Sequence, residues 1–475
     1  MRQEQGDIVL ATGQNRSYAY DRAMAKRNQH PEPSRKIALA GMKAIMSSGK
    51  ALDEWLEHHE PYHRLEPRDR RFCRRLLASS IRYHGQAMLA LRHYVPRAPK
   101  GRQQMATYIL LLALTELIWL DGKSHAVVDQ SVRLIRSVGL EHLHGLINAS
   151  LRRCVKDIET HPSLIQAWKD DHATGFPDWI KSRLIADWGM DQADKIMAAL
   201  LTPPPLDLTM ADPETAADMA EQLGGTLLPQ GSIRLSDGAP AQLEGYVDGR
   251  WWVQDAAATI PVRMMGDIKG KHVIDACAAP GGKTAQCIAG GGNVTAIDQS
   301  AARLIRLKEN LTRLNMTAEV ITADILDWSP QAAVDVVLID APCSATGTIR
   351  RNPDKLTHQK TPDVAMLSDI QMSMVKQAAT WLKSGGILIF ATCSLFRAEG
   401  EDIAARIIRE TDLIPDPIDP QAYAGFMPYE GIAPHLLRLF PDALIDADKD
   451  IKKDADNAMM THGNDGFFMA QFRRR

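Results

Sequence analysis

Two cysteines stand at the ends of apolar runs that the sequence predicts to be strands. Cys343 follows the run 334–342 in the segment DAPCS, and Cys393 ends the run 385–394 in the segment ATCS. Because ligands of a doubly wound sheet bind at the carboxyl ends of its parallel strands, we expect both thiols near one crevice. A thiolate is a nucleophile that can bond covalently to a substrate and activate it.

Such a pair of thiols suits chemistry on a pyrimidine ring. Carbon 5 of cytosine is a poor nucleophile, but a thiolate that adds to carbon 6 makes the ring enamine-like and able to attack a methyl sulfonium. Asp340, three residues before Cys343, is a candidate acid for N3 or the carbonyl of the base. A second cysteine could assist elimination after the carbon 5 proton has left. Residue types alone leave open which cysteine attacks.

The other cysteines predict no further chemistry. Cys73, Cys154 and Cys287 are interpreted as small buried hydrophobes, and Cys277 as a packing or backbone contact. The six cysteines show no CxxC pair or regular spacing, so we expect neither a disulfide framework nor a metal site. Free thiols fit a reducing cytoplasm, which is the predicted location.

A glycine-rich loop follows the predicted strand 272–278. It reads Cys277-Ala-Ala-Pro-Gly-Gly-Lys-Thr284 and leads into the predicted helix 284–289. Adjacent glycines let a ligand approach the backbone, and a helix N-terminus offers free N–H groups. The dinucleotide fingerprint GxGxxG is absent, whereas Gly282-Lys283-Thr284 matches the end of a phosphate-binding P-loop whose leading glycine is replaced by Cys277. The third interpretation is a loop that binds S-adenosylmethionine.

Two aspartates favour a nucleoside ligand at this loop. Asp298 ends the predicted strand 293–298, where a carboxylate can accept hydrogen bonds from ribose hydroxyls. Asp324 ends the predicted strand 319–324, where it could meet an adenine edge. Each could instead cap the helix that follows. Their occurrence on consecutive strands after the loop favours the nucleoside site.

The second half of the chain resembles a known family. The segments VIDACAAPGGKT, VLIDAPCSATGTIRRNPD and GGILIFATCSLFRAEGE are similar to the motifs of the RsmB/NOP (Sun) family of RNA 5-methylcytosine methyltransferases. WWVQDAAA (251–258) resembles the segment before the cofactor loop, and DGFFMAQFRRR (465–475) resembles the last strand. The match covers about 236–475. It implies methylation of an RNA cytosine, with small-subunit ribosomal RNA as the favoured substrate.

The resemblance assigns roles by position. Cys393 would be the nucleophile and Cys343 would assist product release, although DNA cytosine methyltransferases attack from a Pro-Cys motif, which makes Cys343 the alternative nucleophile. Asp298 would hold the ribose, Asp324 the adenine side, and Asp340 the cofactor amine or the target base. The loop residues would line the S-adenosylmethionine pocket: Cys277, Ala278, Ala279, Pro280, Gly281, Gly282 and Lys283.

The front half resembles a NusB-like RNA-binding domain. The residues that carry this are RDRRFCRRLLASSIR, YILLLALTELIWLDGKSHAVVDQSVRLIR and GLINASLRR, and FPDWIKSRLIADWG with PPPLDLTM resembles the family's connector. Helical periodicity over 34–155 predicts an all-α domain, including one apolar stripe from Ile109 to Leu120. From about 236, strands alternate with helices, which predicts a Rossmann-like α/β fold with a doubly wound, mainly parallel sheet. The predicted division is a mobile tail (1–33), the all-α domain (34–155), a connector (156–235) and the methyltransferase domain (236–475).

The charge distribution agrees with an RNA partner. Residues 1–155 hold 25 Lys and Arg against 14 Asp and Glu, whereas 156–475 hold 31 against 44. Arginine binds phosphate through paired hydrogen bonds, so clustered arginines are candidate RNA contacts, although a solvated helix face has the same composition. These candidates are Arg68, Arg70, Arg71, Arg74, Arg75 and Arg82, then Arg152 and Arg153, then Arg350 and Arg351.

Other classes are disfavoured, and two departures from the family pattern stand out. The most apolar window, Tyr108–Leu120, is too short and polar to span a membrane, and the N-terminus does not resemble a secretory signal. We expect a monomer. The alternatives are a P-loop nucleotidase, a non-catalytic RNA-binding assembly factor, or a DNA substrate.

The departures from the family pattern are at two places. They are Gly400, where the family has Asn between two glutamates, and Leu208-Thr-Met-Ala211, where it has Arg and Asn.

Overall fold

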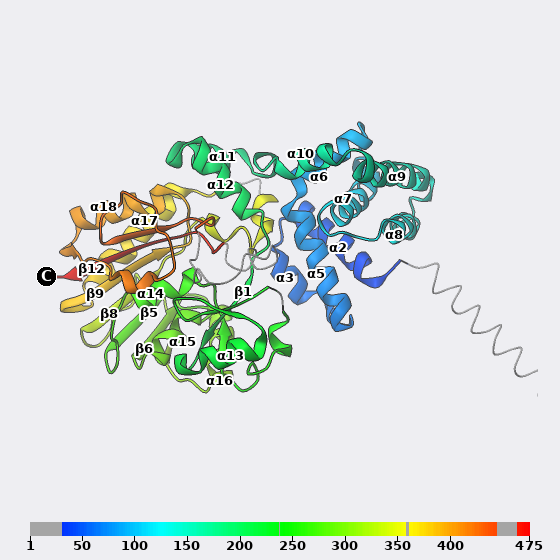
Figure 1. Cartoon of the computed structure of the whole chain (residues 1–475). Helices are drawn as coiled ribbons and strands as arrows, with labels where there is room; N and C mark the ends of the chain where they lie inside the picture. Colours follow the sequence, from blue (N-terminus) through cyan, green and yellow to red (C-terminus); the bar gives the residue numbers. More distant parts are fainter. Residues whose placement is uncertain (1–30, 237, 358–360, 444–462) are drawn as a thin grey trace, which may run out of the picture. The chain divides into compact units, whose positions relative to one another are not determined.

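The computed structural model describes residues 31–236, 238–357, 361–443 and 463–475. By their contacts these residues form two units. The helical unit comprises the described residues up to Pro177 together with 352–357, and the α/β unit comprises the others (Figure 1). The division at Pro177 falls inside the segment predicted as a connector. Residues 1–30 of the predicted tail lie outside the described residues.

The helical unit has no strand among its described residues, and the predicted all-α fold is confirmed. Proline occupies the start of three helices, where the missing N–H would have no partner within the helix. The α-helices are α2 (Pro33–Ser48), α3 (Leu52–His58), α4 (Glu60–His63), α5 (Pro67–Arg82), α6 (His84–Tyr94), α7 (Gln104–Trp119), α8 (Ser124–Ser137), α9 (His144–Thr160) and α10 (Pro162–Asp170).

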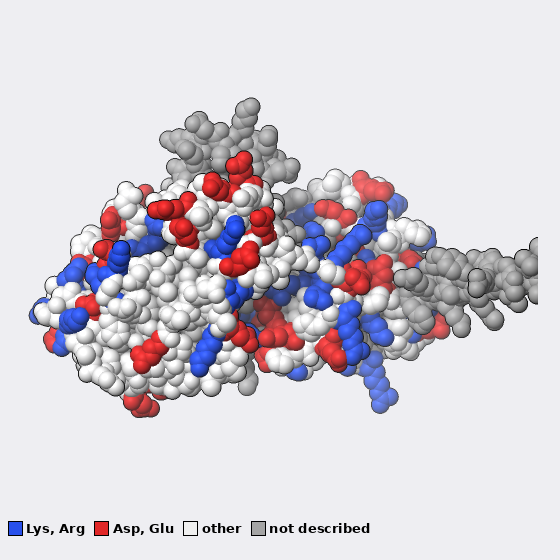
Figure 2. Space-filling view, turned by 90° about the horizontal axis from the view of Figure 1, so that it is seen from below, with Lys and Arg blue, Asp and Glu red and all other residues white. Residues whose placement is uncertain are grey.

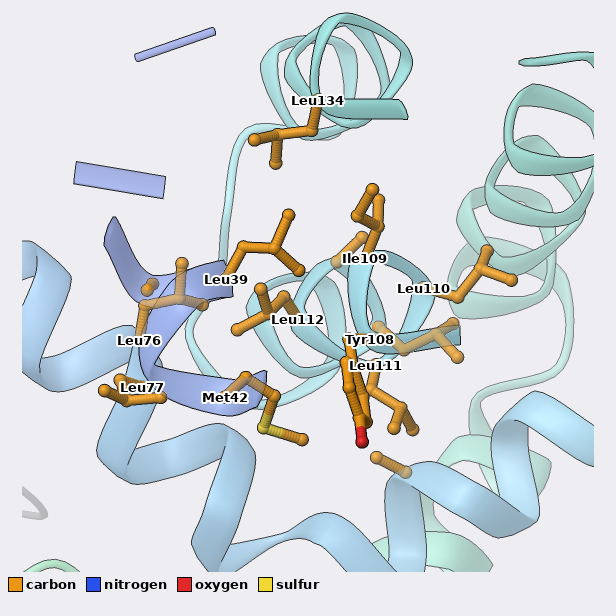
Figure 3. Packing of buried hydrophobic residues seen from close by; sticks show 14 of the residues in the cluster. Leu39, Met42, Leu76, Leu77, Tyr108, Ile109, Leu110, Leu111, Leu112 and Leu134 are labelled. Carbon is orange, nitrogen blue, oxygen red and sulfur yellow. The ribbon is translucent and has the colours of Figure 1, made fainter. Parts of the chain in front are cut away.

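The core of this unit surrounds α7. Figure 3 shows α7 side chains among side chains of α2, α5 and α8, and α6 and α9 contact it as well. Every residue from Ala106 to Ile118 is buried, so the predicted single apolar stripe is wrong: the helix is covered on all sides. Its one charged residue, Glu116, forms a buried ion pair with Arg35. No helix in the described ranges is long and apolar enough to cross a membrane.

The α/β unit is built on a doubly wound sheet in the order β10-β12-β9-β8-β5-β6-β7, with β11 paired to β12. The strands from β5 to β9 run parallel, and β10, β11 and β12 add antiparallel pairs, so the predicted mainly parallel sheet is confirmed. The strands are β5 (His272–Ala276), β6 (Asn293–Asp298), β7 (Glu319–Thr322), β8 (Val334–Asp340), β9 (Leu382–Thr392), β10 (Leu413–Pro415), β11 (Leu436–Leu439) and β12 (Phe467–Arg474).

Helices cover both faces of the sheet (Figure 1). Alternate residues of β8 supply the two cores: Val337 and Ile339 pack with α17 (Val364–Ala379) and α18 (Glu401–Glu410). Val336 and Leu338 pack with α14 (Ile260–Arg263) and α15 (Gly282–Ala289) on the opposite face. A parallel strand buried on both faces is apolar throughout, which is why these runs could be predicted from the sequence. Helix α16 (Ala301–Arg313) packs beside α15.

A small antiparallel sheet precedes the large one and was not predicted. Its strand order is β2-β3-β1-β4, and it carries α13 (Ala216–Leu223). A fully buried ion pair joins Asp207 to Arg234, which face each other across β1 and β3. Charged residues inside such short strands hide the apolar pattern. The bounds are β1 (Leu206–Met210), β2 (Thr226–Leu227), β3 (Ile233–Leu235) and β4 (Trp251–Val253), and α11 (Asp178–Trp188) and α12 (Met190–Leu200) come before them.

Candidate active site

The carboxyl ends of β5, β6, β8 and β9 surround two cavities. The first, of about 570 Å³, is lined by Asp298, Asp324, Cys343 and Cys393 among others. The second, of about 590 Å³, contains Lys283 and the rest of the glycine-rich loop. Cys277, Ala279 and Asp340 line both cavities, so the loop and the end of β8 form the boundary between them.

The two predicted thiols both line the first cavity. The Sγ atoms of Cys343 and Cys393 lie 3.6 Å apart, and both residues are half-buried. The hydrogen bond with Cys393, burial and the charge of Glu399 together hold the pKa of the Cys343 thiol well above its ordinary value. Both thiols can therefore reach the same atoms of a bound substrate. Their electrostatic surroundings differ.

An ion pair lies beside the thiols. Lys283 Nζ donates to Asp340 Oδ2 at 2.7 Å. Burial lowers the pKa of Lys283, but attraction from Asp340, its hydrogen bond, and further attraction from Asp275 and Cys393 outweigh burial and raise it. Lys283 therefore stays an ammonium, a donor held in place by a carboxylate, and it lies 5.5 Å from the ring centre of Phe467.

The glycine-rich loop has two different glycines. Gly281 has φ +103°, and a Cβ there would lie 2.9 Å from Leu307 Cγ, so both its backbone and its packing require glycine. A Cβ at Gly282 would make only ordinary contacts, the nearest at 3.6 Å from Gln254. The protein's own packing does not require glycine at 282, which fits a ligand that comes close to the backbone there.

Both predicted nucleoside-binding aspartates line the first cavity and also form turns. Asp298 is buried and accepts from Ser300 N at 2.9 Å and from Ala279 N at 3.2 Å, which ties the loop to β6. Asp324 is exposed and accepts from Leu326 N at 3.0 Å. Neither aspartate caps a helix: Ser300 is the N-cap of α16, and the described residues between Asp324 and β8 form no helix. Their carboxylate oxygens are acceptors, which fits the hydroxyl and amino groups of a nucleoside.

The predicted loop residues divide between the cavities. Cys277 and Ala279 line both, together with Asp340. The others line the second cavity only: Ala278, Pro280, Gly281, Gly282 and Lys283.

Two residues of the second cavity, Asp255 and Asp465, were missed, and both pair with Arg351, which was predicted as an RNA contact. Arg351 Nε donates to Asp465 Oδ2 at 2.9 Å, and Arg351 Nη2 donates to Asp255 Oδ2 at 2.5 Å. Burial raises the pKa of Asp465 to about 7, against the attraction of Arg351. Asp255 and Asp465 lie within the segments WWVQDAAA and DGFFMAQFRRR, so the motif match was the available signal, but their pairing needs the fold.

Three of the arginines predicted as RNA contacts do not lie on the outer surface. Arg350 is 1% exposed and donates to the carbonyls of Asn464 and Pro203, so it stabilises the interior and does not reach a phosphate. Arg351 is held by two carboxylates in the second cavity rather than on the outer surface. Arg82 is also buried.

The remaining arginines of α5 keep surface positions, with different degrees of freedom. Arg70 is half-buried and donates to the carbonyls of His63 and Leu65, and Arg74 pairs with Asp53 at 2.7 Å. Arg68, Arg71 and Arg75 are exposed. In Figure 2 the basic side chains of the helical unit, on the right, stand among acidic ones.

Packing accounts for both departures from the family pattern. A Cβ at Gly400 would lie 2.5 Å from Arg438 Nη2 and 2.9 Å from Phe468 Cγ, so glycine makes room for this buried arginine. Leu208 and Met210 are buried in the core of the small sheet.

We expect Gly281→Ala to weaken binding of S-adenosylmethionine, the cofactor predicted from the sequence, about tenfold or more, because a Cβ displaces Leu307 and strains the loop that brings Cys277 and Ala279 to the first cavity. Gly385→Ala is the matched control, since Gly385 also has positive φ but has nothing within 4 Å of its Cβ position. Titration calorimetry of both variants measures the effect. Equal affinities would contradict the account of the loop.

Asp275, beneath the loop, predicts a pH-dependent stability. Burial raises its pKa from 3.8 to about 7, so its contribution to stability is present at low pH and is lost as pH rises through 7. Asp275→Asn has no carboxyl group to ionise and so removes this loss. The free energy of unfolding of the variant minus that of wild type should therefore increase by roughly 2 kcal/mol from pH 5 to pH 8. Denaturant unfolding at both pH values tests this, and a constant difference would refute it.

Comparison with known proteins agrees with the geometry. The family model "16S rRNA methyltransferase RsmB/F" matches residues 264–473, and the NusB family model matches residues 32–156, so the predicted NusB-like domain is confirmed. A crystal structure of PH0851 superposes with a TM-score of 0.67 at 19% identity, covering 93% of this chain and 99% of that one, which shows a shared fold.

Curated relatives extend over most of the chain. Ribosomal RNA small subunit methyltransferase B of Serratia proteamaculans is 31% identical over 80% of this chain and 90% of its own length. The protein of the same name from Xanthomonas campestris is 31% identical over 82% of this chain and 90% of its own length. The chain therefore belongs to the RsmB/F family of 16S rRNA methyltransferases, with S-adenosyl-L-methionine as its cofactor.

Proposed function

We propose that the protein methylates carbon 5 of a cytosine in 16S ribosomal RNA through a covalent bond between Cys393 and carbon 6 of the base. The observation that carries this proposal is the 3.6 Å separation of two thiols that line the same cavity as the loop residues Cys277 and Ala279. Methylation of an exocyclic oxygen or nitrogen needs at most one thiol. Two thiols have a use when a ring carbon must be activated by addition and released by elimination.

The first cavity is the proposed place of the cofactor. Asp298 and Asp324 offer acceptors for a nucleoside, and Cys277 and Ala279 bring the loop backbone to the same cavity. When bound, the cofactor supplies a methyl group on a sulfonium. The chain's part is to hold that ligand so that the base meets it beside the two thiols.

The proposed place of the target base is the part of the first cavity beside Asp340, Cys343 and Cys393. Asp340 lines both cavities, and its partner Lys283 is an ammonium donor that can stabilise charge developing on N3 or the carbonyl of the base. Asp340 can accept from the exocyclic amino group. The ion pair thus fills the role predicted for Asp340 as an acid, with Lys283 as the donor. A base within a duplex cannot reach a thiol, so the target must be unstacked.

The raised pKa of Cys343 favours Cys393 as the attacking thiol. The hydrogen bond with Cys393, burial and the charge of Glu399 hold the pKa of the Cys343 thiol above its ordinary value. Cys343 therefore stays protonated while Cys393 adds to carbon 6, and it remains available for the release step.

We expect Cys393→Ala to lower methyl transfer to 16S ribosomal RNA by at least about 10³-fold, the scale seen when a nucleophile is removed. Cys343→Ala should accumulate a protein–RNA adduct that migrates slowly on a denaturing gel. Labelled methyl transfer and the gel measure both effects.

Cys154→Ala is the control for this pair, because Cys154 is buried in the core of the helical unit and lines neither cavity. An adduct in Cys393→Ala rather than in Cys343→Ala would reverse the two roles. Transfer RNA and DNA tested beside ribosomal RNA decide the substrate. A wild type that binds both ligands without turnover would support the assembly-factor alternative, whereas membership in a methyltransferase family removes the nucleotidase.

We further propose that the exposed arginines of α5 bind RNA phosphates. The double variant Arg68→Ala/Arg75→Ala should bind RNA more weakly, and its salt slope, d log K/d log [salt], should be smaller by about 0.7 to 0.9 for each lost phosphate contact. Filter binding at several salt concentrations measures the slope. Arg136→Ala, an exposed arginine of α8 that pairs with Glu141, is the control. An unchanged slope in the double variant would refute RNA contact at this face.

The remaining predictions stay proposals. These are a monomeric state, a cytoplasmic location, and the division into a tail (1–33), a NusB-like domain (34–155), a connector (156–235) and a methyltransferase domain (236–475).

A further inference from the structure

Glu399 is a buried carboxylate between the two cysteine loops. It ends a short 3-10 turn, Arg397–Glu399, after β9, and it is 0% exposed. Its Oε1 accepts from Ser344 N at 2.9 Å and from Gln371 Nε2 at 3.3 Å. Its Oε2 accepts from Ser344 Oγ at 2.5 Å and from Ser394 Oγ at 2.6 Å. Both oxygens are therefore held by two donors each.

Neutral donors, rather than a cation, balance this charge. No Lys, Arg or His forms an ion pair with Glu399 in the described part of the chain, whereas Glu401, two residues later, pairs with Arg438 at 2.8 Å. An isolated buried carboxylate is costly unless hydrogen bonds satisfy it. An apolar side chain would fill the same space at a lower cost in folding free energy. The role of Glu399 therefore lies in the donors that it binds.

Those donors flank both cysteines. Ser344 directly follows Cys343 and Ser394 directly follows Cys393, and their hydroxyls lie 3.1 Å apart. Thr392, which precedes Cys393, donates to the carbonyl of Glu399 at 3.0 Å. Gln371 also donates to the carbonyl of Pro342, which precedes Cys343, at 2.9 Å. The neighbours on either side of each cysteine thus join one network centred on Glu399.

We propose that Glu399 is a positioning residue for methyl transfer: its buried carboxylate ties the loop of Cys343 to the loop of Cys393 and holds both thiols against one target base. This rests on the proposed function for its catalytic meaning, but the thiol geometry exists without it. The charge of Glu399 also contributes to the raised pKa of Cys343, after the hydrogen bond with Cys393 and burial.

The test uses the full-length protein and a probe that needs both thiols. Phenylarsine oxide condenses with two neighbouring thiols, forming two As–S bonds and releasing one water. Its affinity reports the thiol geometry without RNA or cofactor, and mass spectrometry assigns the bridge to Cys343 and Cys393. The same samples are assayed for methyl transfer and, by circular dichroism, for folding.

Glu399→Gln keeps the shape of the side chain but replaces one acceptor oxygen with an amide NH₂ group. That donor would face the two serine hydroxyls, which now donate to the carboxylate. Ser394 Oγ already accepts from Phe396 N at 3.1 Å, so the network cannot simply invert. We expect arsenical affinity and kcat each to fall about tenfold or more, roughly the loss of one charged-group hydrogen bond, with KM for RNA within about twofold. Removal of the anion should also move alkylation of Cys343 by iodoacetamide to lower pH. Glu410→Gln, a surface glutamate on α18, is the matched control.

A second variant keeps the proposal testable if Glu399→Gln does not fold. Ser344→Ala/Ser394→Ala removes both hydroxyl arms, keeps the carboxylate and its bond to Ser344 N, and should weaken arsenical binding in the same way. Wild-type affinity and kcat in a folded variant would overturn the proposal, as would a wild type that does not bind the arsenical. If the variants lose the arsenical but wild type transfers no methyl to RNA, the positioning role stands and the proposed function fails.

Discussion

The register between β8 and β9 is the constraint on which the candidate site depends. Asp340 and Ala391 are partners across these adjacent parallel strands, and Ile339 pairs with Phe390. Each strand therefore ends at the same level of the sheet, and the loops that follow bring Cys343 within 3.6 Å of Cys393 across 50 residues of sequence. A slip by one residue would turn every side chain of a strand to the opposite face and separate the thiols. The cores on both faces of β8 oppose such a slip.

Near the ends of these strands, buried charged side chains are held by partners on other segments of the chain. Lys283 pairs with Asp340, Arg351 with Asp255 and Asp465, and Glu399 is balanced by neutral donors. Such groups cost stability unless each is satisfied, and once satisfied they fix a single arrangement. One of these buried charges, that of Glu399, also contributes to the raised pKa of Cys343.

The sequence predicts the large sheet because parallel strands buried on both faces are continuous apolar runs, as in β8 and β9. It predicts the cysteines and the loop because each stands at a strand end in a recognisable motif. It fails for β1 and β3, whose buried pair Asp207–Arg234 looks like surface sequence. It fails for Arg350 for the same reason, because a single arginine carries no mark of burial and its carbonyl partners at Asn464 and Pro203 lie far along the chain. The stripe expected on α7 was too narrow because a helix surrounded by five others needs no polar face.

The division of the glycine-rich loop between the two cavities also lies beyond sequence reasoning. All of Cys277 to Lys283 belong to one motif, yet the fold directs most of them to the second cavity. The measurement that tests the account most directly is mass spectrometry of nucleosides from unmethylated 16S ribosomal RNA after incubation with the protein and S-adenosylmethionine. The account predicts 5-methylcytidine. A methyl group on the exocyclic nitrogen of cytidine, on a ribose or on another base would contradict it, because none of these needs the paired thiols.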